Sequence, residues 1–204
     1  MSRVRFTTAR SVFETFPSLA SKSSATATDD PPIAFLKNLS AQEKFEDAVA
    51  FCAHMLSRRE AVWWGCGTVR DFWEDIAEGN IHGLAAAETW VHEPTDKNRL
   101  LALQLGNGSD NSDPMTWLAL GAGWSGGMLS TATNPPVPVP HYLTARAVRI
   151  AILLSARYIK GAERPRRMRD CIAEGVKLAE PGEDKTGGQG DISWRDRNRR
   201  FDTA

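Results

Sequence analysis

Residues 59–77 read REAVWWGCGTVRDFWEDIA, and this stretch decides the fold class. Its apolar residues recur at steps of three and four, which is the spacing of one face of an α-helix. The members of this stripe are Val62, Cys66, Val69, Trp73 and Ile76. Gly65 and Gly67 weaken a helix by about 1 kcal/mol each relative to alanine. Glycine is easier to accept where another backbone packs close, so we interpret the pair as a point where a second helix crosses.

The segments around this helix carry helix signals of their own. Ser40 and Glu43 have the spacing of a capping box, which would open a helix with Phe45, Val49, Cys52 and Leu56 on one stripe. Further start signals lie at Thr7 or Thr8, at Thr95 or Asp96, and at Asp113, Thr144 and Pro165. The helix from Thr144 is expected to run to Lys160, and no segment alternates as a strand does. The sequence therefore predicts one all-α domain of about eight helices, packed as a bundle or stacked as solenoid-like pairs.

Composition divides the chain into three parts. Residues 1–30 predict a short helix over Ala9–Phe16, stopped by Pro17, and then a flexible Ser/Ala/Thr-rich linker that reaches Pro32. Residues 31–180 predict the helical domain, and residues 181–204 a disordered polar tail. Within the domain, residues 134–140 hold four prolines and predict an extended polyproline-like segment without ladder donors.

Charge and composition argue against several classes of protein. The 204 residues have a formal net charge of zero, whereas nucleic-acid binding comes mainly from neutralising phosphates. No stretch reaches the ~20 apolar residues that span a bilayer, so no membrane partner is expected. Three widely spaced cysteines, Cys52, Cys66 and Cys171, predict buried free thiols in a reducing cytoplasm.

The sequence contains no recognisable catalytic or cofactor pattern. The four histidines, His54, His82, His92 and His141, lack the spacing of a metal-ligand pair. Glu60 and Asp71 lie about three helical turns apart, roughly 16 Å, which is too far for a glycosidase carboxylate pair. Ser125 closes a helix and does not follow a strand, so it is no nucleophile elbow. We therefore expect no metal, no cofactor and no enzyme activity.

Two interpretations of the tryptophan-rich helix stay open. Trp64 falls opposite the apolar stripe and Trp63 on its flank. Either the helix is buried on two sides and both rings are core, or they form a partner surface, since tryptophan and arginine are enriched at binding hot spots. On the second interpretation the partner-binding residues are Arg59, Glu60, Trp63, Trp64, Trp124, Pro135, Pro136, Pro138 and Pro140.

Basic residues also gather on the helix after Thr144, at Arg146, Arg149, Arg157 and Lys160. A nucleic-acid site would interleave aromatic residues, and only Tyr158 is near. We interpret this stripe as a solvated face. The tail segment WRDRNRRF at residues 194–201 combines aromatic and basic residues and could act as a short docking peptide.

Four motifs together resemble an uncharacterised bacterial family of small helical proteins. They are RREAVWW at 58–64, AAAETWV at 85–91, WSGG at 124–127, and LTARAV at 143–148 after the proline-rich stretch. The similarity covers roughly residues 8–180. Such proteins often accompany type VI secretion genes, so the resemblance implies an accessory, adaptor or chaperone-like role. It transfers no functional residue.

These observations lead to three hypotheses of function. The first is a non-enzymatic, cytoplasmic protein-interaction module whose partner is a secretion component or an effector. The second is an immunity protein that neutralises a co-encoded toxin. The third is a small enzyme with an unrecognised site formed by Arg59, Glu60 and His141. The sequence does not decide the oligomeric state.

Overall fold

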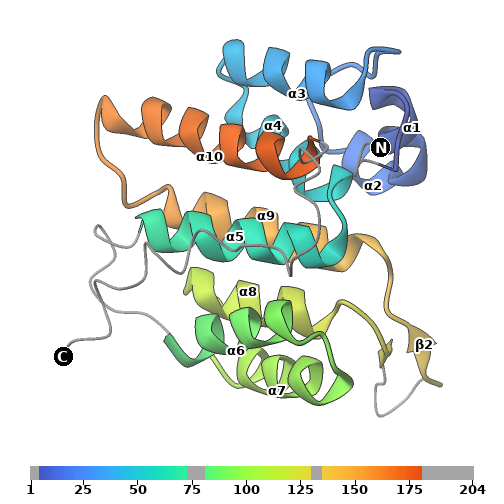
Figure 1. The fold of residues 1–204 in the computed structure, drawn as a ribbon, viewed down its shortest axis with the longest axis vertical. Helices are drawn as coiled ribbons and strands as arrows, with labels where there is room; N and C mark the ends of the chain where they lie inside the picture. Colours follow the sequence, from blue (N-terminus) through green and yellow to red (C-terminus); the bar gives the residue numbers. More distant parts are fainter. Residues whose placement is uncertain (1–4, 73–80, 130–134, 181–204) are drawn as a thin grey trace, which may run out of the picture.

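A computed structural model describes residues 5–72, 81–129 and 135–180, and these residues form ten helices and one small β-ribbon (Figure 1). The all-α prediction is confirmed. The elements are α1 Ala9–Thr15, α2 Pro17–Ala20, α3 Pro32–Ala41, α4 Phe45–Met55, α5 Arg58–Phe72, α6 Ile81–His92, α7 Asp96–Asn107, α8 Pro114–Gly123, β1 Met128–Leu129, β2 Val137–Pro138, α9 Tyr142–Ser155 and α10 Glu163–Ala179. Trp73 and Ile76 of the predicted stripe, and the tail from residue 181, lie outside the described residues.

The helices pack in three layers, with α5 and α9 in the middle (Figure 1). Helices α3, α4 and α10 cover one side of this pair, and α6, α7 and α8 cover the other. A Cβ at Gly65 of α5 would lie 2.7 Å from Leu118 Cδ2 of α8 and 3.1 Å from Val148 Cγ1 of α9. Gly65 is therefore the crossing point that the sequence predicted. Gly67 is not, because a Cβ there would meet no atom within 4 Å.

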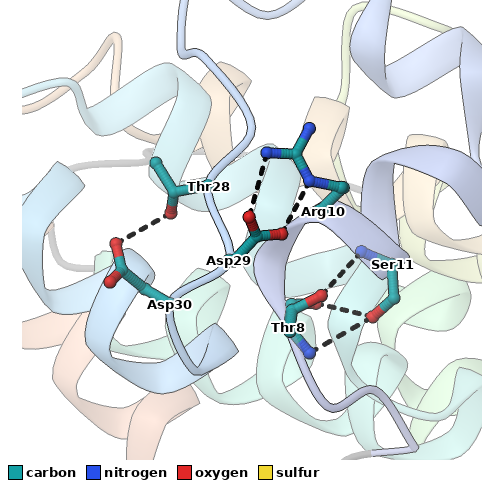
Figure 2. A network of polar contacts seen from close by, with 6 residues as sticks. All are labelled: Thr8, Arg10, Ser11, Thr28, Asp29 and Asp30. Carbon is teal, nitrogen blue, oxygen red and sulfur yellow. Dashed lines mark hydrogen bonds and ion pairs between the residues drawn. The ribbon is translucent and has the colours of Figure 1, made fainter.

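The N-terminal segment packs into the same core as the rest of the domain. Val12, Phe13, Phe16 and Leu19 are buried in the main hydrophobic cluster. Thr8 and Ser11 form the capping box of α1, and Arg10 binds Asp29 with an Nε–Oδ1 distance of 2.7 Å (Figure 2). The backbone N–H groups of Ala9 and Arg10 donate to the carbonyl oxygens of Asp30 and Thr28.

These contacts correct the prediction of a flexible linker over residues 18–32. Pro17 stops α1 as expected, but it also takes the first position of α2, where its missing N–H costs nothing. Downstream, Ser23 Oγ and the backbone N–H of Ser24 both donate to Asp47 Oδ1 of α4. Serine and threonine side chains thus hold the segment by hydrogen bonds, which a search for apolar periodicity cannot detect.

Two predicted helix starts are wrong. Ser40 lies in the last turn of α3, and Glu43, at φ 56°, closes that helix instead of capping the next one. The Lys44 and Glu43 N–H groups donate to the Leu39 and Ser40 carbonyls, the pattern of a Schellman motif. Thr144 lies inside α9, where its buried hydroxyl donates to the Gly121 carbonyl of α8 at 3.0 Å. Helix α9 also ends at Ser155, not at Lys160.

The proline-rich segment forms a strand, which the sequence did not predict. Val137 and Pro138 of β2 pair antiparallel with Leu129 and Met128 of β1. Although its prolines lack N–H groups, Val139 still donates to the Gly127 carbonyl at 3.1 Å. The valines that alternate with the prolines keep their N–H groups, and these are enough for a short ladder of hydrogen bonds between β1 and β2.

Candidate functional site

The first residues of the tryptophan-rich helix bind other parts of the same chain. Arg59 Nε donates to the Val91 carbonyl at 2.6 Å, and its Nη2 to the His92 carbonyl at 3.3 Å. Both carbonyls belong to the last turn of α6, where a cation is favoured by the helix dipole. Arg59 therefore fixes α5 against α6.

Glu60 has an equally local role. Its Oε2 accepts the backbone N–H of Ser57 at 3.1 Å, while the Ser57 Oγ accepts the Glu60 N–H at 3.3 Å. Glu60 lies three residues after Ser57, and the two residues form a reciprocal capping box at the start of α5. The sequence reasoning placed a capping box at Ser40 and overlooked this one, although Ser57 and Glu60 have the same spacing.

Trp64 belongs to the core. Its side chain is 3% exposed, and its Nε1 donates to the Cys171 carbonyl of α10 at 2.9 Å. A Cβ at Gly175, on the next turn of α10, would lie 3.1 Å from Trp64 Cε2. Of the two open interpretations, core burial therefore holds for Trp64. Trp63 is half-buried and lies at the edge of a groove.

This groove, which we call the α5–α6–α10 groove, has a volume of about 300 Å³. Helices α6 and α10 lie on opposite sides of α5, so the exposed face of α5 forms its floor (Figure 1). Its apolar wall comes from Trp63, Trp64, Cys66, Val91 and Leu178. Gly67 is exposed within the floor, and the open space above its Cα is part of the groove.

Four of the charged residues on the groove rim form two ion pairs. Arg70 Nε and Nη2 bind the two carboxylate oxygens of Glu88 of α6, at 2.5 and 2.6 Å. Lys177 Nζ binds Glu174 Oε1 of α10 at 2.8 Å. With Asp71 the lining holds two cations and three carboxylates, placed around an apolar floor. An apolar floor suits a ligand held mainly by apolar contact.

Cys66 lines the groove but is not a nucleophile candidate. Burial raises the pKa of its thiol well above the ordinary value, with a further contribution from the negative charge of Glu88. The three cysteines are free and buried, as the sequence predicted. Thiolate chemistry requires the opposite, an exposed thiol of lowered pKa.

The residues proposed for an unrecognised enzyme site do not converge. His141 Nδ1 lies 2.5 Å from Nη2 of Arg58, while Arg59 points to α6 and Glu60 to its own helix end. Arg58 and His141 line a separate cavity of about 300 Å³, to which neither Arg59 nor Glu60 contributes. Burial lowers the pKa of the Arg58 guanidinium, and the charge of Arg5 adds to this shift.

The remaining predicted contact residues lie away from the groove. Trp124 is half-buried and packs edge-on against Trp117, with ring centroids 6.4 Å apart. Pro135, Pro136 and Pro138 are exposed on or beside the β-ribbon, and Pro140 is half-buried where it joins α9. None of these residues lines the groove. The nine predicted residues thus occupy several separate places, and only Trp63 and Trp64 reach the groove.

Two further properties bear on the class of site. Within residues 5–72, 81–129 and 135–180, no three His, Cys, Asp or Glu side chains are placed to hold a metal ion. None of the helices in these ranges has the length and apolar character needed to cross a membrane.

Comparison with known proteins places the chain in a family. The sequence model of a family described as "Family of unknown function (DUF6931)" matches residues 35–179, more than two thirds of the chain. The chain belongs to this family. Searches of the curated proteins and of the solved structures gave no match. This agrees with the predicted membership of an uncharacterised family.

The DUF6931 match begins inside α3 and ends with the last residue of α10. All residues of the α5–α6–α10 groove fall within it. Helices α1 and α2 precede it, although they share the hydrophobic core. The groove is therefore formed by the part of the chain that defines its membership of DUF6931.

Proposed function

We propose that this DUF6931 protein is a protein-interaction module that takes a large apolar side chain of a partner into the α5–α6–α10 groove. The observation that carries the proposal is the half-buried Trp63 beside the open floor at Gly67. A tryptophan that keeps an exposed edge over an apolar cavity is the residue type most enriched at binding hot spots. The groove volume of about 300 Å³ is large enough for an aromatic side chain.

The occupant we propose is a partner helix or strand that presents one aromatic or aliphatic anchor. Four of the rim charges form the ion pairs Arg70–Glu88 and Lys177–Glu174, and an uncharged anchor of this kind leaves both pairs in place. The resemblance to proteins encoded near type VI secretion genes supports a cytoplasmic accessory, adaptor or chaperone-like role, with a secretion component or effector as the partner.

Gly67 allows a sharp test of this proposal. Gly67→Met would place a long apolar side chain in the groove, and Gly67→Ala would add only one methyl group at the same position. The full-length chain and both variants are used to capture partners from a bacterial host, and each captured protein is then purified and titrated against them. We expect a binary complex that Gly67→Ala retains and that Gly67→Met weakens at least tenfold.

Equal affinity of the two variants for every purified partner would refute docking in the groove. The identity of the captured protein separates the roles. A secretion component or effector supports the accessory role, and a toxin encoded beside this chain, inhibited on binding, would instead establish the immunity hypothesis.

A further inference from the structure

A second cavity, which we call the α2–α4–α9 pocket, lies between these three helices and has a volume of about 50 Å³. It shares no lining residue with the α5–α6–α10 groove. Ser18 of α2 and Lys22 just after it form one wall, and Asp47 and His54 of α4 a second. Helix α9 supplies the third wall through Tyr142, Arg146 and Arg149.

Arg149 is the anomaly of this pocket. Its side chain is half-buried, and its Nε is buried with no hydrogen-bond partner. A buried donor left without a partner costs about 1–3 kcal/mol, and such atoms usually meet a water or an ion. On its sequence alone, Arg149 is interpreted as part of an exposed, solvated stripe. In such a stripe the Nε of the guanidinium group would be hydrogen-bonded to water and not buried without a partner.

The pocket carries an excess of positive charge. Among the described residues, Lys22, Arg146 and Arg149 form no ion pair. Asp47 is the one carboxylate in the lining, and it already accepts hydrogen bonds from Ser23 Oγ at 2.9 Å and from Ser24 Oγ at 2.5 Å. Three cations thus face one occupied carboxylate.

His54 adds no charge to this balance at neutral pH. Burial lowers the pKa of its ring to about 4, and the charge of Arg149 acts in the same direction. Its Nδ1 lies 2.7 Å from the Ala50 carbonyl oxygen of its own helix. The net charge of the lining at pH 7 is therefore +2.

We propose that the α2–α4–α9 pocket binds a phosphate group, either free phosphate or the phosphoryl group of a small phosphomonoester. The cavity volume of about 50 Å³ exceeds the roughly 10–15 Å³ that one water needs, and a phosphate group is a compact ligand. The planar guanidinium groups of Arg146 and Arg149 suit oxyanions, which they bind through paired N–H donors. Ser18 on the α2 wall and Tyr142 on the α9 wall are lining residues whose hydroxyls can act as neutral donors.

The test is a calorimetric titration of the full-length chain at pH 7.5 with sodium phosphate, against sodium chloride at matched ionic strength. A parallel titration with glycerol 3-phosphate separates the two sources. We expect saturable binding of phosphate and none of chloride. Tighter binding of glycerol 3-phosphate would assign a phosphomonoester, and tighter binding of phosphate would assign the free ion.

Three variants locate the binding. Arg146→Ala removes an exposed side chain, so the fold should survive, and we expect the Kd for phosphate to rise at least tenfold. Arg149→Met keeps the buried stem and should have the same effect. Arg157→Ala removes an exposed arginine just beyond the end of α9 and should change nothing. Absence of phosphate binding, or an equal response of Arg146→Ala and Arg157→Ala, would overturn the proposal.

Discussion

Arg59 donates through Nε to the Val91 carbonyl at 2.6 Å and so attaches the start of α5 to the end of α6. This hydrogen bond gives Arg59 a structural role, although the sequence made it a candidate for partner binding. Similar contacts recur elsewhere in the fold. Arg99 donates to the Gly123 carbonyl at the end of α8, and Arg167 to the Asp71 carbonyl near the end of α5.

Replacing Arg59 by methionine should destabilise the fold by about 1 kcal/mol, because it removes a charge-assisted hydrogen bond at a helix end but keeps the apolar stem. Urea denaturation followed by circular dichroism measures the change. Arg157→Met, on an exposed side chain with no ion pair among the described residues, is the control and should stay within about 0.5 kcal/mol of the parent chain.

The two glycines of α5 should respond in opposite directions to alanine. A Cβ at Gly65 would come within 2.7 Å of Leu118, so Gly65→Ala should cost about 1–3 kcal/mol through overpacking. Gly67 faces open space, so Gly67→Ala should stabilise the helix by up to about 1 kcal/mol. The same urea experiment tests both, and equal signs would contradict the packing of α5 against α8.

Glycine at position 43 should stabilise the chain relative to alanine. Glu43 has φ 56°, a left-handed conformation that costs a residue with a Cβ about 1 kcal/mol. Both substitutions remove the exposed ion pair with Arg169, so comparing Glu43→Gly with Glu43→Ala isolates the backbone effect. We expect a higher unfolding midpoint for Glu43→Gly, and the reverse order would rule out the left-handed closure of α3.

His54 should make the fold less stable in mild acid. Burial lowers its pKa from 6.5 to about 4, so between these values the unfolded chain binds the proton and the folded chain does not. The contribution of neutral His54 to the free energy of unfolding is fully present above pH 6.5 and declines as the pH falls towards 4. It should lower the free energy of unfolding by about 2 kcal/mol at pH 5 relative to pH 8.

Paired urea titrations at pH 5 and pH 8 measure this effect. In His54→Gln the difference between the two pH values should shrink by about the same 2 kcal/mol. His82→Gln, at an exposed position, should behave as the parent chain. A parent-like pH dependence in His54→Gln would assign the acid sensitivity to other groups.

The three thiols should be unreactive in the folded state. Burial raises the pKa of Cys171 to about 12 and raises that of Cys52 as well. Ellman's reagent at pH 8 should label none of the cysteines in buffer and all three once urea has unfolded the chain. Rapid labelling of a native thiol would contradict the packing of α10 on α4 and α5.

The sequence predicted the helical class, the Asp113 cap and the crossing at Gly65, because these signals are local or periodic. It left two further caps between Thr7 and Thr8 and between Thr95 and Asp96, and the caps in the structure are Thr8 and Thr95. It failed at Ser40 and Thr144, where a hydroxyl that could cap a helix lies within one. Whether Ser40 can cap the following helix depends on where α3 ends, and Glu43 decides this through a left-handed turn that its residue type does not signal.

The candidate sites were less accessible to sequence reasoning. The sequence placed Trp64 opposite the apolar stripe and Trp63 on its flank, but only the position of α10 decides that Trp64 is covered and Trp63 is not. Arg149 was interpreted as part of a solvated stripe, since nothing in its local sequence reveals that it lines a pocket together with residues of α2. Both outcomes depend on contacts between residues about a hundred positions apart or more.

The hydrogen bond between Trp64 and the Cys171 carbonyl joins residues 107 positions apart, so it can form only after α10 has been synthesised. Helix α10 contacts α3, α4 and α5, so these helices keep an uncovered apolar side until the last turn, near Ala179, has emerged from the exit tunnel. During most of its synthesis the nascent chain therefore exposes the apolar side of α3, α4 and α5. Exposed apolar surfaces of this kind are what cotranslational chaperones bind.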